Sequence, residues 1–263
     1  MKLNIYQIDA FTDKVFTGNY AAVIILEEWL KDELMQSIAM ENNLSETAFL
    51  KNTIDNTYEI RWFSPLSEID FCGHATLASA YVLFEQNDTL KDIVFTADAV
   101  GSLTVSKEND GYIKMIFPNR KPEEIKSIPE SLLKGLSITP TQVLLSQQAY
   151  FAIYDNENDV YNVEQNTEEI KKLAPYDVVV SAPSNEYDFV SRYFWPANGG
   201  DEDPVTGSIH TGLAPYWADK LNKNELKAFQ ASKRGGLLLC TVTSDNVIIQ
   251  GKAVKYLEGI IHI

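Results

Sequence analysis

The sequence of 263 residues has few of the features that would mark a disulfide-rich, metal-stabilised or membrane protein. Its two cysteines, Cys72 and Cys240, are isolated, so no disulfide framework is expected. The three histidines and two cysteines lack the spacing of a structural zinc site. No apolar run reaches the roughly 18 residues of a membrane-spanning helix, and the N-terminus lacks the apolar core of a secretory signal. These absences predict a cytoplasmic protein with no membrane segment and no resident metal.

Positive charge is also scarce. The chain has 22 Lys and Arg residues against 37 Asp and Glu residues, a formal net charge of -15. Nucleic acids and anionic membrane surfaces bind clustered basic side chains, so neither is an expected partner. The hydrophobic fraction of 45% is ordinary for a globular protein, and the length suits one large domain or two smaller ones.

An internal repeat is present. The segment CGHATLASAYVLF, which begins at Cys72, aligns with TGSIHTGLAPYWA, which begins at Thr206. The same offset of 134 residues aligns Phe95 with Phe229 further along the chain. A constant offset over two segments predicts two similar lobes, residues 1–118 and 119–263, with a ligand cleft between them. The C-terminal strand, residues 253–263, could belong to either lobe.

The periodicity predicts an α+β fold. Strands are expected at residues 2–11, 21–26 and 57–64, and a helix at 29–43. The helix after Gly73 is apolar on nearly every face, so other structure must surround it. The simplest architecture that satisfies the repeat has two halves, each with strands around one central helix.

Acidic residues and a glycine precede the central helix in each half. Because a helix N-terminus offers unpaired N–H groups and partial positive charge, two such ends can hold a carboxylate or an enolate-like oxygen. Alternatively, Asp70, Asp203 and Ser208 only cap their helices. The duplication of the pattern favours the ligand site.

Two further residues could carry a proton. In the segment 43–50, read as a strand, Glu46 shares an apolar face with Ala48 and Leu50. A carboxylate on such a face needs a partner, or serves as a general acid or base; an edge-strand Glu in solvent is the alternative. His74 at the helix start is a candidate proton relay, or a partly buried histidine bonded to backbone.

Cys72 stands directly before the first central helix, where a thiol of low pKa is conceivable. Its counterpart in the second half is Thr206, so a symmetric pair of thiols is absent.

Four segments of the sequence resemble the signature blocks of the PhzF-like family, named for the isomerase of phenazine biosynthesis. They are IDAFTDKVFTGNYAAV, NNLSETAFL, IRWFSPLSEIDFCGHATLASA and DEDPVTGSIHTGLAPYWA, in the family's order. The resemblance implies the diaminopimelate epimerase fold, with two pseudo-symmetric lobes that each form a β-barrel around a central helix. It also implies a homodimer and a reaction without metal or organic cofactor. Tyr20 stands where the family usually has proline, which affects one wall of the pocket.

The resemblance also implies the site. Glu46 takes the place of the glutamate that moves a proton, with His74 and Asp203 as the other catalytic residues. The expected substrate-binding residues are Asn19, Ser45, Gly73, Gly207 and Ser208.

These observations predict an isomerase that shifts a proton on a small, anionic, carboxylate-bearing metabolite by general acid/base catalysis. Two alternatives stay open. One is a racemase or epimerase on the same fold that uses Glu46 and Asp203 in place of thiols. The other is a protein that binds a metabolite without turnover.

Overall fold

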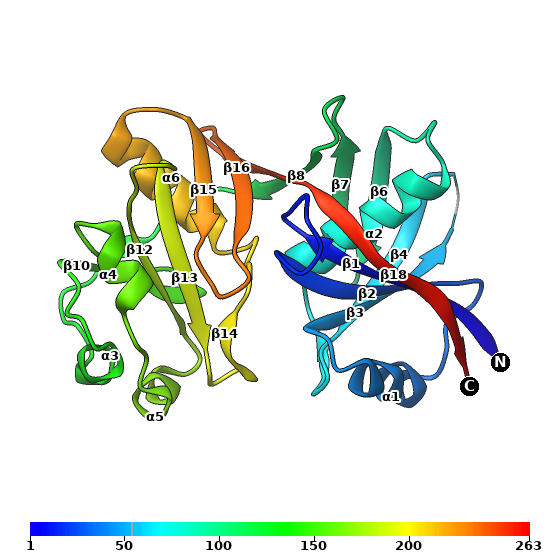
Figure 1. The fold of residues 1–263 in the computed structure, drawn as a ribbon, viewed down its shortest axis with the longest axis horizontal. Helices are drawn as coiled ribbons and strands as arrows, with labels where there is room; N and C mark the ends of the chain where they lie inside the picture. The colour runs from blue at the N-terminus through cyan, green and yellow to red at the C-terminus, as the bar shows by residue number, and fades with distance from the viewer. Residues whose placement is uncertain (54) are drawn as a thin grey trace. The chain divides into compact units, whose positions relative to one another are not determined.

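A computed structural model describes residues 1–53 and 55–263, which form two compact units. The first contains residues 1–116 and 250–263, and the second contains residues 117–249 (Figure 1). The C-terminal strand β18 (Ala253–His262) belongs to the first unit because it pairs antiparallel with β1 (Lys2–Ala10) along its length. No helix among the described residues is long and apolar enough to cross a membrane.

The first unit is built from strands around one helix. Its further elements are β2 (Asn19–Leu26), α1 (Asp32–Asn42), β3 (Glu46–Asn52), β4 (Thr57–Phe63), β5 (Glu68–Ile69), α2 (Gly73–Gln86), β6 (Asp92–Ala97), β7 (Gly101–Lys107) and β8 (Ile113–Pro118). The pairs β2–β3 and β4–β6 are parallel, and the pairs β1–β2, β3–β4, β4–β5, β6–β7 and β7–β8 are antiparallel. Each parallel pair needs a crossover, which α1 and α2 supply.

Helix α2 forms the centre of the first unit. Nearly all of its residues are buried, and it contacts β1, β2, β3, β7 and β18. An apolar helix of this kind is stable only when other elements cover all its faces, as the sequence predicted.

The second unit repeats this plan. Its elements are β9 (Glu123–Glu124), α3 (Glu130–Gly135), β10 (Gln142–Leu145), β11 (Ala149–Ile153), α4 (Glu157–Asn162), α5 (Thr167–Ile170), η1 (Lys171–Leu173), β12 (Asp177–Pro183), β13 (Phe189–Trp195), β14 (Gly200–Asp203), α6 (His210–Leu221), β15 (Glu225–Gln230), β16 (Gly236–Val242) and β17 (Asn246–Gly251). The strands from β10 to β16 follow the pairing pattern of β1 to β7, with parallel pairs β11–β12 and β13–β15.

The register of the strands matches the repeat seen in the sequence. Phe95 of β6 pairs with Leu103 of β7, and Phe229 of β15 pairs with Leu237 of β16. Both residues of the second pair lie 134 positions after those of the first, so the sequence offset corresponds to equivalent places in the two units.

Strand β3 is buried on both faces, as is usual for a strand in a parallel pair. Phe49 packs in a cluster with Met35 and Ile38 of α1, and Thr47 accepts a hydrogen bond of 3.0 Å from Asn42 of the same helix. Because side chains alternate along a strand, Glu46 lies on the opposite face, toward α2. Helix α1 begins at Asp32 rather than at residue 29.

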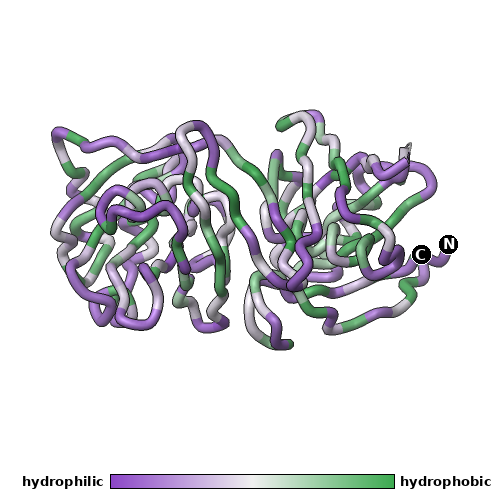
Figure 2. The backbone as a smooth tube through the Cα atoms, turned by 90° about the horizontal axis from the view of Figure 1, so that it is seen from above, coloured by the Kyte–Doolittle hydropathy of each residue, from purple (hydrophilic) through white to green (hydrophobic). Residues whose placement is uncertain are grey.

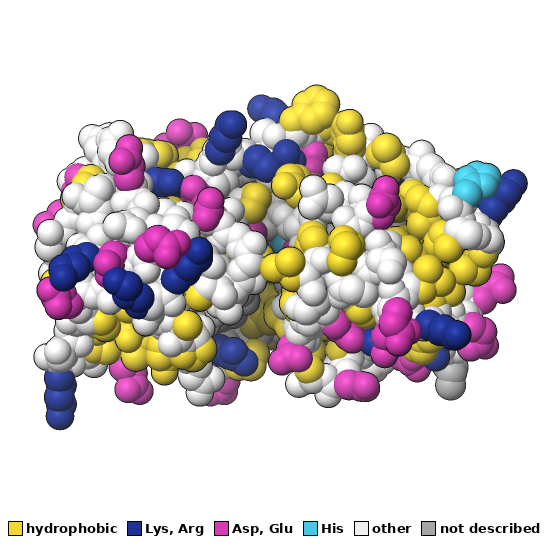
Figure 3. Space-filling model, turned by 90° about the horizontal axis from the view of Figure 1, so that it is seen from below, with side chains coloured by type: hydrophobic (Ala, Val, Ile, Leu, Met, Phe, Trp, Pro, Cys, Tyr) yellow, Lys and Arg dark blue, Asp and Glu magenta, His cyan; other side chains and the backbone are white. Residues whose placement is uncertain are grey.

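Hydrophobic and hydrophilic stretches alternate along the tube of both units (Figure 2). On the face shown in Figure 3, Lys and Arg side chains lie interspersed with Asp and Glu side chains.

In the second unit a further hydrophobic cluster packs α3, α4 and α5 against β12 and β13, with Tyr154 and Phe194 among its largest side chains.

His210, the first residue of α6, is a packed core residue. Its ring stacks on Phe189 with centroids 5.9 Å apart, and its Nδ1 lies 2.8 Å from the carbonyl oxygen of Thr206. Nε2 has no hydrogen-bond partner among the described residues. Burial lowers the pKa of His210 to about 4, from an ordinary value of 6.5.

We therefore expect the protein to lose stability as pH falls from about 6.5 to about 4. In this window the unfolded chain binds a proton at residue 210 that the folded chain does not, which amounts to about 3 kcal/mol over the whole window. Urea unfolding at several pH values, for the natural protein and for His210→Gln, measures this contribution. The variant should show a shallower loss of stability on acidification. The same substitution at the exposed His262 serves as the control, and equal pH slopes for His210→Gln and the natural protein would contradict the expectation.

Candidate active site

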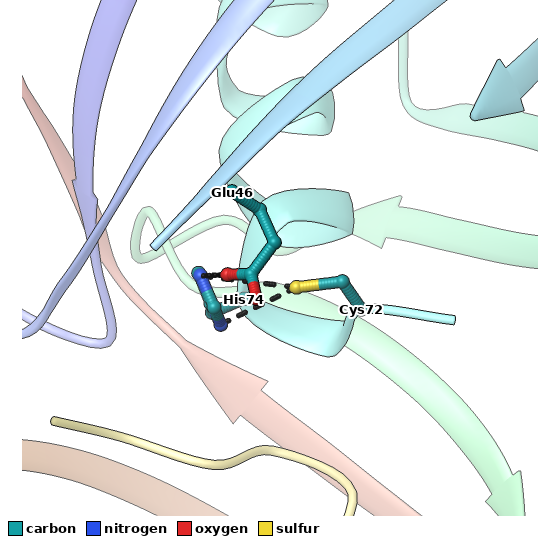
Figure 4. Close-up of side chains that lie close together, drawn as sticks. All are labelled: Glu46, Cys72 and His74. Carbon is teal, nitrogen blue, oxygen red and sulfur yellow. Dashed lines mark hydrogen bonds and ion pairs between the residues drawn. The ribbon is translucent and has the colours of Figure 1, made fainter. Parts of the chain in front are cut away.

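Glu46 is the first residue of β3 and is buried, with 5% of its surface exposed. Its Oε2 lies 2.7 Å from Nε2 of His74, the second residue of α2 (Figure 4). The carboxylate therefore has its charged or hydrogen-bonding partner at the start of the central helix. The alternative of an edge-strand glutamate turned to solvent is wrong, because β3 lies between β2 and β4.

The other side of the His74 ring faces Asn19. The Nδ2 atom of Asn19 lies 3.1 Å from Nδ1 of His74, and Oδ1 of Asn19 accepts a hydrogen bond of 3.0 Å from the Ser45 hydroxyl. Ser45, Asn19, His74 and Glu46 thus form a continuous chain of polar contacts. Asn19 and Ser45, which the sequence analysis assigned to substrate binding, both lie behind the imidazole.

The loop before β2 positions Asn19. Gly18 has a φ of +68°, and a Cβ atom there would lie 2.2 Å from the carbonyl oxygen of Ala10. Only glycine fits both the backbone conformation and this close approach. The loop therefore delivers Asn19 to the start of β2, where its amide reaches His74.

Opposing effects act on the charge of His74. Burial disfavours the imidazolium, but the Cys72 sulfur and the Glu46 carboxylate beside the ring raise the pKa of His74 well above its ordinary value. An imidazolium donates from both ring nitrogens. Asn19 can serve that state with its amide reversed, so that Oδ1 accepts from Nδ1 and Nδ2 donates to the Ser45 oxygen. The Asn19 amide can therefore form a hydrogen bond with either protonation state of His74, and the Ser45 hydroxyl can donate to that amide or accept from it.

Cys72 is the N-cap residue of α2 and is buried. Its Sγ lies 3.4 Å from Nδ1 and 3.7 Å from Nε2 of His74. Nearly equal distances place the sulfur beside the ring rather than in line with one nitrogen. Burial raises the pKa of Cys72 to about 11, so the structure does not bear out a thiol of low pKa at this place.

No side chain among the described residues caps α2 by a hydrogen bond, so Asp70 does not act as its cap. The first-turn N–H groups, including that of Gly73, thus keep the positive end of the helix available to an anion.

In the second unit, Asp203 ends β14 and approaches the start of α6. The Thr206 hydroxyl donates to Oδ2 of Asp203. Gln230 fixes this corner, because it donates to the backbone oxygen of Asp203 and accepts from the backbone N–H of Thr206, each at 2.8 Å.

Gly207 and Ser208 precede helix α6 rather than open it. The helix begins at His210, and no side chain in the described part of the chain caps it. Because α2 begins at Gly73, the offset of 134 residues would place the start of the second central helix at Gly207, and α6 begins three residues later. The difference arises because residues 207–209 form turns, with the N–H of His210 bonded to the oxygen of Gly207.

Ser208 ends a partly buried polar chain that the sequence analysis missed. Gln148 donates to the Ser208 hydroxyl and to the Tyr193 hydroxyl, each at 2.9 Å. Tyr193 donates to Asp177 at 2.5 Å, and Asn198 donates to the other oxygen of that carboxylate at 2.7 Å. Burial raises the pKa of Asp177 despite these two donors.

The expected site residues thus fall into two groups, each described within its own unit. The first unit holds Asn19, Ser45, Glu46, Gly73 and His74, which lie at the start of α2 and on the strands beside it. The second unit holds Asp203, Gly207 and Ser208, which lie at the start of α6.

Residues 8–259 match the model of the PhzC-PhzF family, described as phenazine biosynthesis-like protein. An uncharacterized isomerase of Pseudomonas aeruginosa is 45% identical over 263 residues, which cover all of both chains. A crystal structure of a PhzF-family protein from Enterococcus faecalis has a TM-score of 0.95 at 40% identity and covers all of both chains. A hydroxyproline epimerase from Agrobacterium vitis shares the fold alone, with a TM-score of 0.60 at 9% identity over 99% of this chain and 92% of that one.

The chain therefore belongs to the PhzC-PhzF family, and it is an isomerase of that family. The resemblance seen in the sequence is confirmed, and so is the predicted fold of the epimerase superfamily.

The buried chain in the second unit gives a test of stability. We expect Tyr193→Phe to destabilise the protein by about 1–3 kcal/mol, because the buried Asp177 carboxylate loses its donor and Gln148 loses an acceptor. Urea unfolding at neutral pH measures the change. The matched control is Tyr256→Phe, at a residue that is 47% exposed, where a change within about 0.5 kcal/mol is expected. Equal stabilities of the two variants would show that the chain contributes little.

Proposed function

We propose that this isomerase moves a proton on a small anionic metabolite, next to a carbonyl, imine or conjugated system, with Glu46 as the group that takes and returns the proton. One observation carries the proposal: the buried Glu46 carboxylate lies 2.7 Å from Nε2 of His74 at the N-terminal end of α2. A carboxylate and an imidazole in contact can exchange a proton without water as an intermediary.

His74 assists Glu46. Its imidazolium stabilises the ionised carboxylate, which is the form that abstracts a proton. When Glu46 carries the proton, Asn19 and Ser45 keep the ring oriented from the other side. In this proposal Asn19 and Ser45 position the catalytic pair.

The substrate class follows from the helix end. The first-turn N–H groups of α2, beside Gly73, provide donors and partial positive charge for a carboxylate or for a developing oxyanion. This favours a carboxylate-bearing substrate, even though the chain has a net charge of -15. The participation of Asp203, Gly207 and Ser208 stays a prediction from the family resemblance, as does the homodimer.

An acid/base epimerase is the second candidate. Thiol-based epimerisation needs two cysteines at equivalent places. In this sequence the residue that aligns with Cys72 in the repeat is Thr206, which has no thiol. Burial also raises the pKa of the Cys72 thiol, so little of the thiolate, the form that would act as the base, is present at neutral pH. An epimerase on this chain would therefore rely on carboxylates.

The test is deuterium incorporation. The protein is incubated in heavy water with a panel of small unsaturated and amino- or hydroxy-substituted carboxylic acids, and mass spectrometry follows the exchange. We expect Glu46→Gln to reduce incorporation by about 100-fold or more while the protein folds normally, because glutamine does not accept the proton. A fully active variant would overturn the assignment of Glu46.

The matched control is Glu41→Gln, an exposed glutamate on α1, which should leave incorporation unchanged. Deuterium at a stereocentre with no shift of a double bond would favour the epimerase. Small molecules that co-purify with Glu46→Gln, identified by mass spectrometry, would name the substrate.

A further inference from the structure

Three different metal-ligating side chains meet at the start of α2. One ligand atom each of Glu46, Cys72 and His74 lies within 4.8 Å of the other two, the one such group of three among the described residues (Figure 4). Each of the three side chains belongs to a residue with 5 or 6% of its surface exposed. A thiolate, an imidazole and a carboxylate together are the donor set that borderline divalent metals such as Zn²⁺ prefer.

The spacing of the donors is close to that of a tetrahedral centre. Around Zn²⁺, bond lengths of about 2.0–2.3 Å place neighbouring donor atoms about 3.3–3.6 Å apart. Here the Cys72 sulfur lies 3.7 Å from Nε2 of His74, which needs almost no change. The Glu46 oxygen lies 2.7 Å from the same nitrogen, so the carboxylate must move back by about 0.6–0.9 Å to reach this spacing.

The imidazole plane must also turn. The sulfur is nearly equidistant from both ring nitrogens, so the lone pair of Nε2 has to rotate into the space between the sulfur and the carboxylate. The partner on the other side of the ring permits this state. With a metal on Nε2, Nδ1 carries the proton and needs an acceptor. In the structure Nδ2 of Asn19 faces Nδ1, so the Asn19 amide must reverse to offer Oδ1 to Nδ1 and Nδ2 to Ser45.

We propose that Glu46, Cys72 and His74 form a binding site for one Zn²⁺-like cation, and that the bound ion blocks proton transfer by Glu46. On binding, the Cys72 thiol and Nε2 of the His74 imidazolium each release a proton to solvent, and the ion takes the place of the contact between Nε2 and the carboxylate. Three protein ligands leave a fourth position for water. The geometry of the three donors supports the binding site. The block of proton transfer by the bound ion rests in addition on the proposed function of Glu46.

Cobalt(II) is the probe, because a bond between cobalt and a thiolate gives a charge-transfer band in the near ultraviolet. One equivalent of Co²⁺ is added to the untagged, reduced, full-length protein, and Zn²⁺ is then added to displace it. We expect the band to appear with one ion per chain and to vanish with Zn²⁺. Absence of the band in the natural protein overturns the site.

Variants locate the ion. Cys72→Ser should lose the band and bind Zn²⁺ more weakly by at least the roughly 10–100-fold seen when a metal site loses an outer-shell partner. The matched control is Cys240→Ser, at the other buried free cysteine, which should keep the band. A band that persists in Cys72→Ser overturns the proposal. Glu46→Gln gives an independent test, since it keeps the sulfur but should bind Zn²⁺ more weakly; equal affinity overturns the assignment of the carboxylate.

Deuterium incorporation tests the block separately. Zn²⁺ should stop incorporation by the natural protein, and an excess of chelator should restore it. If Co²⁺ gives the band but Zn²⁺ leaves incorporation unchanged, the block is wrong and the binding site stands. If no substrate exchanges deuterium at all, the proposed function fails, and the spectrum still decides whether the ion binds.

Discussion

The contact between the Glu46 carboxylate and the His74 imidazole is the interaction on which the function proposed for this chain depends. A glutamate on the apolar face of a strand is costly to bury unless a partner offsets the loss of hydration. His74 supplies that partner, and the wall of strands around α2 keeps both groups away from bulk solvent. The same burial that makes the pair expensive makes its proton affinities sensitive to whatever binds beside it.

The duplicated architecture explains why the pair lies where it does. In each unit a parallel crossover places an apolar helix inside the sheet, so the helix N-terminus lies among strand ends. The two units have since diverged at this position. The first carries Cys72 and His74 at the helix start, whereas the second carries Thr206 at the place of the cysteine and starts its helix three residues later than the repeat predicts. A shared fold therefore supports different chemistry at equivalent positions.

The polar surroundings of each helix start also differ. In the first unit Asn19 and Ser45 hold the imidazole from behind. In the second unit Gln148 links Ser208 to Tyr193, and Tyr193 donates to the buried Asp177. Buried networks of this kind keep side chains in one orientation, because each unpaired donor or acceptor would cost free energy.

The repeat and the two central helices could be predicted from the sequence, because they follow from local periodicity and from a constant offset. The sequence left the burial of Glu46 open, and the fold settles both that question and which side chains meet. Strand pairing brings the C-terminal strand to β1, and the loop through Gly18 brings Asn19 to His74. The spacing of cysteines and histidines gave no sign of a metal-ligating cluster, because its carboxylate comes from β3 and its other two donors from the start of α2. Contacts between residues far apart in the chain depend on register and crossovers, which no local pattern encodes.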